Sequence, residues 1–213
     1  GVKNEFFGFN GRKLKKEFKP FKSVLEDSEI GGYPHFMLKE IMDQKSSIAT
    51  AFQQDSSKVN DFSKAILKAD KVFLTACGTA FHACLVGRHL LKEIAGIDSR
   101  PILASEFSEI EGELDENSMV IAVSQSGETA DLISAVKLAS SKGCKIFSIV
   151  NVESSTLARI SEIFLPLKCG KETAVASTKA FTSQLAIFSL ISSSASGKHF
   201  EFEKVSEVVS RII

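Results

Sequence analysis

Residues 118–129 read Ser118-Met119-Val120-Ile121-Ala122-Val123-Ser124-Gln125-Ser126-Gly127-Glu128-Thr129, and this stretch decides the fold. Its unbroken apolar run is typical of a strand that is covered on both faces of a parallel sheet. A polar turn follows at once, and an amphipathic helix is predicted over residues 129–142. Strand, turn and helix in this order predict one unit of an α/β sheet.

The same alternation continues on both sides of this unit. Strands are predicted at residues 71–75, 101–104, 118–123, 144–150 and 163–167, and helices at 62–69, 80–94, 129–142, 178–194 and 199–213. A further helix is predicted from near Pro34, because Met37, Ile41, Ile48 and Phe52 share one helical face. The pattern predicts an α/β domain with a doubly wound parallel sheet and helices on both faces, in three α/β/α layers.

The N-terminal segment differs from the rest of the chain. Asn10-Gly11 lies between two short runs that contain apolar residues, which predicts a hairpin. The polar, glycine-containing sequence around residues 24–32 indicates a linker. We therefore expect two segments, residues 1–30 with the hairpin and linker, and residues 31–213 with the sheet.

The overall composition excludes several classes of protein. The 213 residues contain 26 Lys and Arg against 26 Asp and Glu, a balance that argues against nucleic-acid binding. No apolar run approaches the length of a membrane span, and the N-terminus lacks the apolar region of a signal peptide. We expect a cytoplasmic protein without a membrane partner.

Cysteine and histidine spacing gives no sign of a metal site. Four cysteines lie far apart and are expected to be reduced, mostly buried thiols: Cys77, Cys84, Cys144 and Cys169. The histidines His35, His82, His89 and His199 show no ligand spacing, and packing or surface roles are expected for them. We expect neither a metal nor a cofactor.

The turn at residues 124–129 is the strongest candidate site. Three hydroxyls, on Ser124, Ser126 and Thr129, surround the flexible Gly127 where a helix begins. Free backbone N–H groups and the helix dipole at such a start favour a phosphomonoester without any Lys or Arg. The competing interpretation is ordinary helix capping, which could account for Thr129 by itself.

Two other turns carry weaker signals. Gly78 and Thr79 follow the strand at 71–75, and Gly78 permits close approach of a ligand. Cys77 invites assignment as a nucleophile, but nothing local marks an activating base, so a structural thiol is favoured. Neither a dinucleotide fingerprint nor the G-x-S-x-G motif of serine hydrolases is present.

The third turn, residues 170–179, combines small residues with hydroxyls before a long helix, which suits contact with a polyol. Glu172 and Lys179 invite acid and base roles there. A surface ion pair or a complement to the helix dipole is favoured for either residue.

Four motifs, in order and at matching intervals, strongly resemble the glutamine–fructose-6-phosphate aminotransferases, also called glucosamine-6-phosphate synthases. They are His35-Phe36-Met37-Leu38-Lys39-Glu40-Ile41, Ala76-Cys77-Gly78-Thr79, Ser124-Gln125-Ser126-Gly127-Glu128-Thr129-Ala130-Asp131 and Val175-Ala176-Ser177-Thr178-Lys179-Ala180-Phe181-Thr182. The resemblance covers the linker and the first of two sugar-isomerase (SIS) subdomains, and it implies the SIS fold. It also implies that the N-terminal hairpin is the remnant of a glutaminase domain.

The resemblance implies a set of ligand contacts. Ser124, Gln125, Ser126 and Thr129 would hold the phosphate of a hexose 6-phosphate, either fructose 6-phosphate or glucosamine 6-phosphate. Thr79 would lie beside the ligand, and the Val175 carbonyl and the Ser177 hydroxyl would face the sugar hydroxyls. The residue after Thr79 is commonly Ser in the family, and Ala80 here removes one hydroxyl, at a cost of about 1 kcal/mol if that bond is not replaced.

The resemblance also implies an activity that this chain does not complete. In the family, the Schiff-base lysine, the glutamate base and the ring-opening histidine belong to a second SIS subdomain, the glutamine-cleaving cysteine is N-terminal, and the enzyme is a homodimer. We find no candidate for the isomerising base here, so we expect sugar-phosphate binding without complete catalysis. A phosphosugar-sensing regulatory module and a fragment with only residual binding remain as alternatives.

Overall fold

Five parallel strands form the centre of the structure, in the order β4-β3-β5-β6-β7. They are β3 (Lys71–Ala76), β4 (Arg100–Leu103), β5 (Ser118–Ser124), β6 (Lys145–Val150) and β7 (Ile163–Pro166). The structure is a computed structural model, and it describes residues 6–7, 11–14, 30–198 and 202–212. The chain winds from β3 outward to β4, then crosses back to β5 on the other side of β3 and continues outward. This confirms the doubly wound sheet and places the reversal of strand order between β3 and β5.

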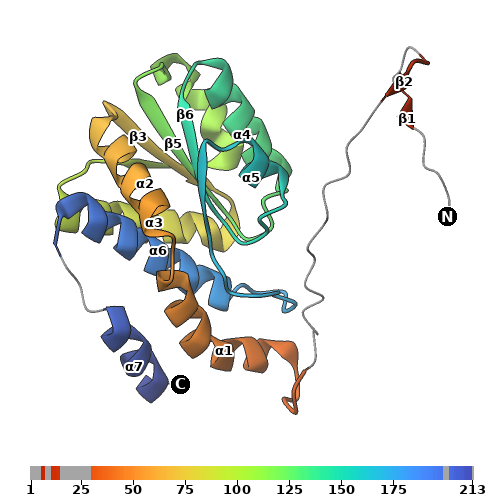
Figure 1. Cartoon of the computed structure of the whole chain (residues 1–213), viewed down its shortest axis with the longest axis vertical. Helices are drawn as coiled ribbons and strands as arrows, with labels where there is room; N and C mark the ends of the chain where they lie inside the picture. Colours follow the sequence, from red (N-terminus) through yellow and green to blue (C-terminus); the bar gives the residue numbers. More distant parts are fainter. Residues whose placement is uncertain (1–5, 8–10, 15–29, 199–201, 213) are drawn as a thin grey trace.

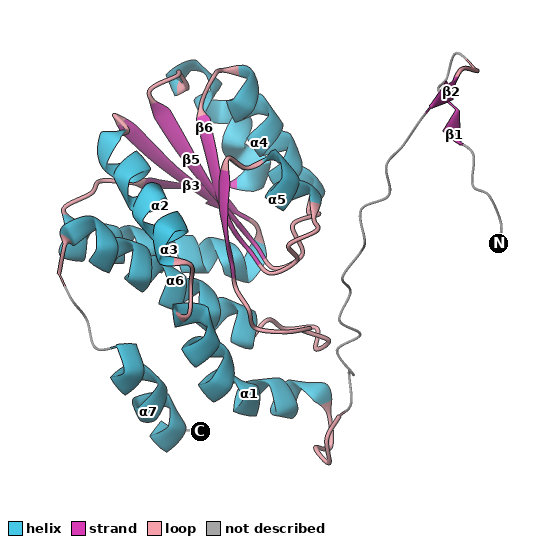
Figure 2. Cartoon of the chain, in the orientation of Figure 1, coloured by secondary structure: helices cyan, strands magenta, loops and turns pink. Residues whose placement is uncertain are grey.

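Helices cover both faces of the sheet (Figures 1 and 2). One face carries α2 (Ser56–Lys68), α3 (Gly78–Ala95) and α6 (Lys179–Ser196), and α1 (Phe36–Phe52) packs on α6. The other face carries the 3₁₀ helix η1 (Ala104–Glu113), α4 (Ala130–Ser141) and α5 (Thr156–Ile160). The last helix, α7 (Phe202–Ile212), packs against α1. The predicted three layers are therefore confirmed.

Alternate residues along the strands pack into two separate hydrophobic cores, one on each face of the sheet. Ile121 joins the core under α2, α3 and α6, while its neighbours Val120 and Ala122 join the core under α4 and η1. Every residue of β5 is buried, as the continuous apolar run predicts for a central strand covered on both faces. Phe62 of α2 meets Phe147 of β6 edge to face at 4.8 Å between ring centroids, which ties this helix to the sheet.

Three elements differ from the sequence prediction. The helix α2 begins at Ser56 rather than at Phe62, because the Asp55 carboxylate accepts a hydrogen bond from Ser57 N at 2.9 Å and starts the helix earlier. The short helices η1 and α5 are not predicted by the sequence, because neither shows a clear α-helical period. The remaining predicted strands and helices up to residue 196 are confirmed, with ends that differ by one or two residues, and the last predicted helix corresponds to α7.

The hairpin is present where Asn10-Gly11 predicts it. The strands β1 (Phe6–Phe7) and β2 (Lys13–Leu14) pair antiparallel, and Figure 1 shows them apart from the sheet. Most of the predicted linker and the predicted helix start at His199 lie outside the described residues. No helix of the described residues is long and apolar enough to cross a membrane.

Candidate functional site

A cavity of about 150 Å³ lies at the carboxyl ends of β3 and β5, at the reversal of strand order. Its lining residues are Cys77, Thr79, Ala80, Val123, Ser124, Gln125, Ser126, Thr129, Ser177 and Gln184. The structure thus brings together six of the seven predicted site residues. The seventh, Val175, does not line the cavity, and its side chain is fully exposed.

In the turn after β5, the hydroxyls of Ser124 and Ser126 can each donate a hydrogen bond to a ligand. Gly127 N donates to Ser124 Oγ at 2.8 Å, and Glu128 N donates to Ser126 Oγ at 3.2 Å. Each serine oxygen therefore already accepts a hydrogen bond from the backbone. Its own hydrogen remains available to a ligand oxygen, which is the arrangement that a phosphate requires.

Gly127 is needed for the shape of this turn. Its φ is +67°, and a Cβ at this position would overlap Ser155 Oγ and lie 2.9 Å from Val150 Cγ2. Leu157 N also donates to the Gly127 carbonyl at 3.1 Å, so this peptide lies directly against the start of α5. A side chain at residue 127 would push the turn away from α5 and displace the two serines.

The back of the turn is held by the connection between β6 and α5. The Gln125 carbonyl accepts from Asn151 N and Val152 N, each at 3.3 Å. The Glu128 carboxylate accepts from Thr156 N at 2.6 Å, and this backbone hydrogen bond is the main reason that the pKa of Glu128 lies below its usual value. These contacts fix the turn before any ligand arrives.

Two helices begin at the cavity without a side-chain cap. Thr129 occupies the N-cap position of α4 and Cys77 that of α3, and neither side chain makes a capping hydrogen bond. By contrast, Asp55 caps α2 and Ser155 caps α5. The backbone N–H groups at the starts of α3 and α4 therefore lack side-chain cap partners, which gives the cavity positive potential. The capping interpretation of Thr129 is wrong for its side chain.

Glu172 organises the loop that carries Ser177 and forms one wall of the cavity. One carboxylate oxygen accepts from Thr178 N at 2.8 Å and from Ala180 N at 3.2 Å, so Glu172 caps α6. The other oxygen accepts from Ser177 Oγ at 3.0 Å. The predicted role of Glu172 as a complement to the helix dipole is confirmed. Because Ser177 donates to Glu172, its oxygen remains free to accept from a sugar hydroxyl.

The helix α1 supports this wall from behind. The buried Glu40 carboxylate accepts from Thr173 N at 2.5 Å and from Ala174 N at 3.1 Å. Lys179 Nζ lies 3.3 Å from the Asp43 carboxylate, and only 6% of Lys179 is exposed. The prediction of a surface ion pair is therefore wrong for Lys179, whose ion pair lies beneath the loop.

The Asp43 carboxylate forms ion pairs with two lysines, Lys39 and Lys179. Burial raises the pKa of Asp43, but the hydrogen bond from Lys39 and the charge of Lys179 outweigh it, and the pKa lies below its usual value. The Lys39 ammonium lies 2.7 Å from Asp43. The charged cluster therefore fixes α6 against α1 rather than serving the cavity.

The lining contains no acid or base that could work at neutral pH. None of its ten residues is Lys, Arg, His, Asp or Glu. Burial and, next, the Asp131 carboxylate raise the pKa of Cys77, which keeps this thiol protonated. Positive potential for an anion therefore comes from the backbone alone, and the nucleophile interpretation of Cys77 gains no support.

Sequence reasoning missed one polar member of the lining, Gln184. Its only signal is its position four residues after the buried Ala180, on the same inward face of α6. The sequence alone does not show that this face of α6 lies against a cavity, so nothing in it marks Gln184 as a site residue.

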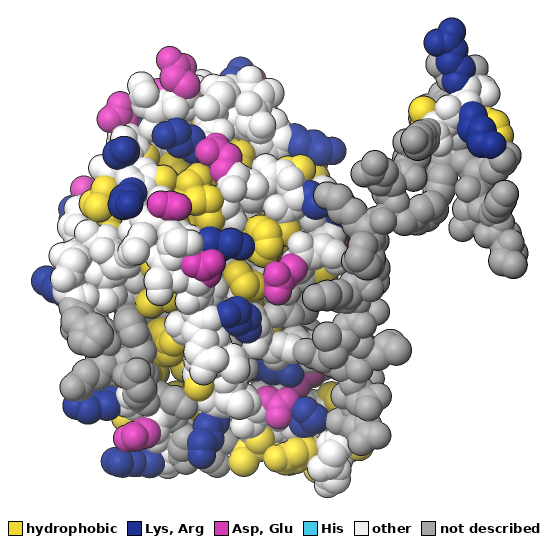
Figure 3. All heavy atoms as spheres, viewed as in Figure 1, with side chains coloured by type: hydrophobic (Ala, Val, Ile, Leu, Met, Phe, Trp, Pro, Cys, Tyr) yellow, Lys and Arg dark blue, Asp and Glu magenta, His cyan; other side chains and the backbone are white. Residues whose placement is uncertain are grey.

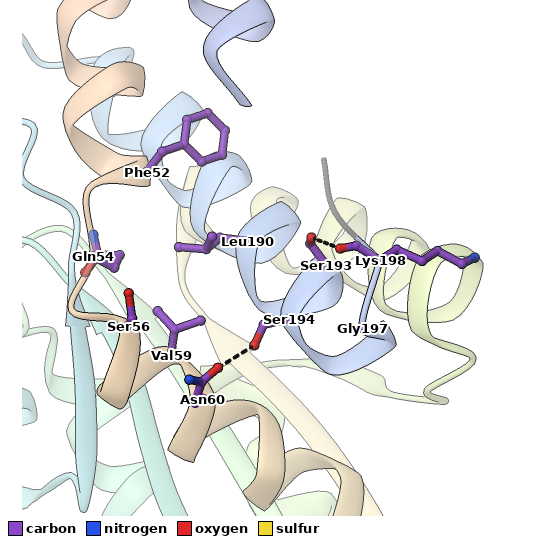
Figure 4. A pocket seen from close by; sticks show the side chains of 10 residues that line it. All are labelled: Phe52, Gln54, Ser56, Val59, Asn60, Leu190, Ser193, Ser194, Gly197 and Lys198. Atoms are coloured by element: carbon purple, nitrogen blue, oxygen red, sulfur yellow. Dashed lines mark hydrogen bonds between the residues drawn. The ribbon is translucent and has the colours of Figure 1, made fainter. Parts of the chain in front are cut away.

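A second cavity, of about 430 Å³, lies between α2 and α6 (Figure 4). Within its lining, Ser194 Oγ donates to Asn60 Oδ1 at 3.4 Å, and Ser193 Oγ donates to the Lys198 carbonyl at 2.6 Å. The nearby start of α2 is capped by the Asp55 carboxylate, which repels anions. This cavity lies away from the reversal of strand order, so we favour the smaller one as the site.

Comparison with known proteins fits this geometry. The SIS domain family matches residues 65–194, which include both turns at the ends of β3 and β5 and the Ser177 wall. The chain belongs to the SIS domain family. Its cavity lies at the reversal of strand order within the matched residues.

The relatives of this SIS domain are named glutamine–fructose-6-phosphate aminotransferase (isomerizing). The protein from Pyrococcus horikoshii is 39% identical over 180 residues, which are 83% of this chain and 30% of the relative. The protein from Caldanaerobacter subterraneus is 38% identical over 218 residues, which are 98% of this chain and 36% of the relative. The SIS domain therefore corresponds to only a part of these enzymes.

A solved structure shares the fold. The C-terminal domain of glucosamine-fructose-6-phosphate aminotransferase from Francisella tularensis superposes with a TM-score of 0.72 and 27% identity. The alignment covers 87% of this chain and 55% of that domain. The SIS domain described here thus matches roughly half of the solved one.

Proposed function

We propose that this chain is the sugar-phosphate-binding SIS domain of a glutamine–fructose-6-phosphate aminotransferase. It binds hexose 6-phosphates, with fructose 6-phosphate and glucosamine 6-phosphate as the expected ligands. The observation that carries the proposal is the cavity where α3 and α4 both begin without side-chain caps, beside the hydroxyls of Ser124 and Ser126. Such a cavity suits a phosphate because backbone N–H groups and hydroxyls donate to it.

The two ends of the ligand have distinct partners in this proposal. Ser124, Gln125, Ser126 and Thr129 hold the phosphate. Thr79 and Ser177 face the sugar, and the Val175 carbonyl contacts a sugar hydroxyl. The exposed Val175 side chain leaves that role to the backbone alone.

Binding in this chain is not accompanied by complete catalysis. Moving a proton between C1 and C2 of the sugar needs a placed base, and the ten lining residues supply none at neutral pH. Glu172 and Lys179 lie close by, but helix capping and the Asp43 ion pair engage them. We assign the missing groups to a second SIS subdomain.

The proposal includes the assembly of the whole enzyme. Residues 31–213 form the SIS domain, and residues 1–30 are the hairpin and linker from a glutaminase domain. The enzyme is a cytoplasmic homodimer that transfers ammonia from glutamine. Figure 3 shows Lys and Arg mixed with Asp and Glu on the visible face, which suits a small-molecule enzyme better than a nucleic-acid binder.

Calorimetric titration tests the proposal. Fructose 6-phosphate is expected to bind and unphosphorylated fructose is not. Ser126→Ala removes one hydroxyl donor to the phosphate, and the expected loss is about 10-fold to 150-fold, the worth of a hydrogen bond to a charged group. Ser141→Ala is the matched control, because Ser141 donates to the Leu138 carbonyl at the far end of α4. Equal binding of fructose and fructose 6-phosphate, or no binding by a folded chain, would overturn the proposal.

A further inference from the structure

Gln184 is a buried polar side chain that the described protein does not satisfy. Only 2% of the residue is exposed, and its Oε1 has no hydrogen-bond partner among the described residues. Buried amide groups in folded proteins are normally paired, since an unpaired one costs about 1 to 3 kcal/mol. Three other buried side-chain oxygens of the described residues are unpaired, on Thr75, Ser99 and Thr178, and only Gln184 lines the cavity.

Two residues of the lining have no group that could pair with the amide. Ala80, from the first turn of α3, and Val123, from β5, contribute only apolar side chains to the same cavity. Both are buried, and α3 packs directly against α6. Gln184 therefore supplies hydrogen-bonding capacity to a lining in which Ala80 and Val123 supply none.

We propose that Gln184 binds a hydroxyl of the sugar and so selects sugar phosphates over other phosphate compounds, an inference that rests on the function proposed above. The terminal torsion of glutamine is broad and roughly two-fold, so rotation about it can turn the amide oxygen or the amide nitrogen toward the cavity. A sugar hydroxyl both donates and accepts, and it therefore pairs with the amide oxygen or the amide nitrogen. The dianion of a phosphomonoester only accepts, so the phosphate of the sugar could not satisfy Oε1.

The geometry separates this contact from phosphate binding. The phosphate turn at residues 124–129 is held by β6 and α5, whereas Gln184 belongs to α6 on the opposite face of the sheet. Removing the Gln184 amide is therefore expected to affect the sugar contact and to leave the phosphate contact intact. Because Oε1 has no hydrogen-bond partner among the described residues, an apolar side chain of similar length should not lower the stability of the protein.

Titration of the full chain with two ligands tests the inference. Gln184→Met is expected to weaken fructose 6-phosphate binding about tenfold and to change binding of inorganic phosphate by less than about twofold. The melting temperature without ligand is expected to stay equal or to rise. Gln44→Met is the matched control, since the Gln44 side-chain amide donates to the Ile41 carbonyl within α1. Gln184→Leu repeats the test if the Met variant fails to fold.

Each contrary outcome has a distinct meaning. Wild-type affinity for fructose 6-phosphate in a folded Gln184 variant would overturn this inference and leave the proposed function intact. Equal weakening for both ligands would also overturn it, because Gln184 would then act through the phosphate turn. A folded wild-type chain that binds neither ligand would overturn the inference together with the proposed function.

Discussion

Replacing Gly127 with alanine tests how the phosphate turn is built. Two costs add. The left-handed φ of +67° costs an L-residue about 1 to 2 kcal/mol. The new methyl group would overlap Ser155 Oγ and crowd Val150, and forced overpacking costs about 1 to 3 kcal/mol. A smaller entropic gain in the unfolded chain offsets part of this, so we expect a net loss of about 2 to 4 kcal/mol in the free energy of unfolding.

Urea denaturation measures this loss, and two other glycines separate its causes. Gly96 has φ +71°, and no atom lies within 4 Å of the place that a Cβ would take, so Gly96→Ala isolates the backbone cost, about 1 kcal/mol. Gly112 has neither a positive φ nor a neighbour within 4 Å, and Gly112→Ala is expected to change stability by less than about 0.5 kcal/mol. If Gly127→Ala costs no more than Gly96→Ala, the close packing of the turn against Ser155 is refuted.

Three further changes test the framework around the cavity. Gly87→Ala should destabilise the chain by about 1 to 2 kcal/mol in urea, since a Cβ there would lie 2.7 Å from the buried Phe188 ring; unchanged stability would contradict that packing. Glu172→Ala should cost about 1 kcal/mol through loss of the α6 cap and lower the melting temperature, and an unaltered melting curve would argue against the cap. The pKa of Asp43 is lowered in the folded state by the hydrogen bond from Lys39 and the charge of Lys179, so its ion pairs with both lysines stabilise the fold above the unfolded pKa and are lost as pH falls through the folded one. Asp43→Asn should therefore flatten the loss of stability below about pH 4, and parallel wild-type and variant pH curves would exclude these ion pairs.

The sheet was predictable from the sequence because its strands are continuous apolar runs. The run at residues 118–123 has no helical alternative of adequate length, and the helices between strands force parallel order. The starts of helices were less predictable. Asp55 begins α2 well before its apolar period becomes visible, and η1 and α5 are held by tertiary contacts rather than by their own pattern.

The candidate site was predictable where it follows strands directly. Ser124, Ser126 and Thr129 are recognisable because a hydroxyl-rich turn joins a buried strand to a helix. The contacts that hold the loop beside Ser177 were not predictable, because they join residues distant in the chain. Glu40 of α1 is an example, since its carboxylate accepts from Thr173 N.

Gln184 shows the same limit on the opposite side of the cavity. Its amide meets the site only because α6 packs on α3 beside Ala80, a contact between segments that lie far apart in the chain. The sequence gives the identity of residue 184 but not which residues surround it in the fold.

The central claim is that the phosphate of a hexose 6-phosphate binds where α3 and α4 begin. A crystal structure of this chain with fructose 6-phosphate tests it most directly. We predict phosphate oxygens within hydrogen-bonding distance of the Ser124, Ser126 and Thr129 hydroxyls, with the sugar extending toward Ser177 and Gln184. A phosphate bound elsewhere, such as in the cavity between α2 and α6, would contradict the account.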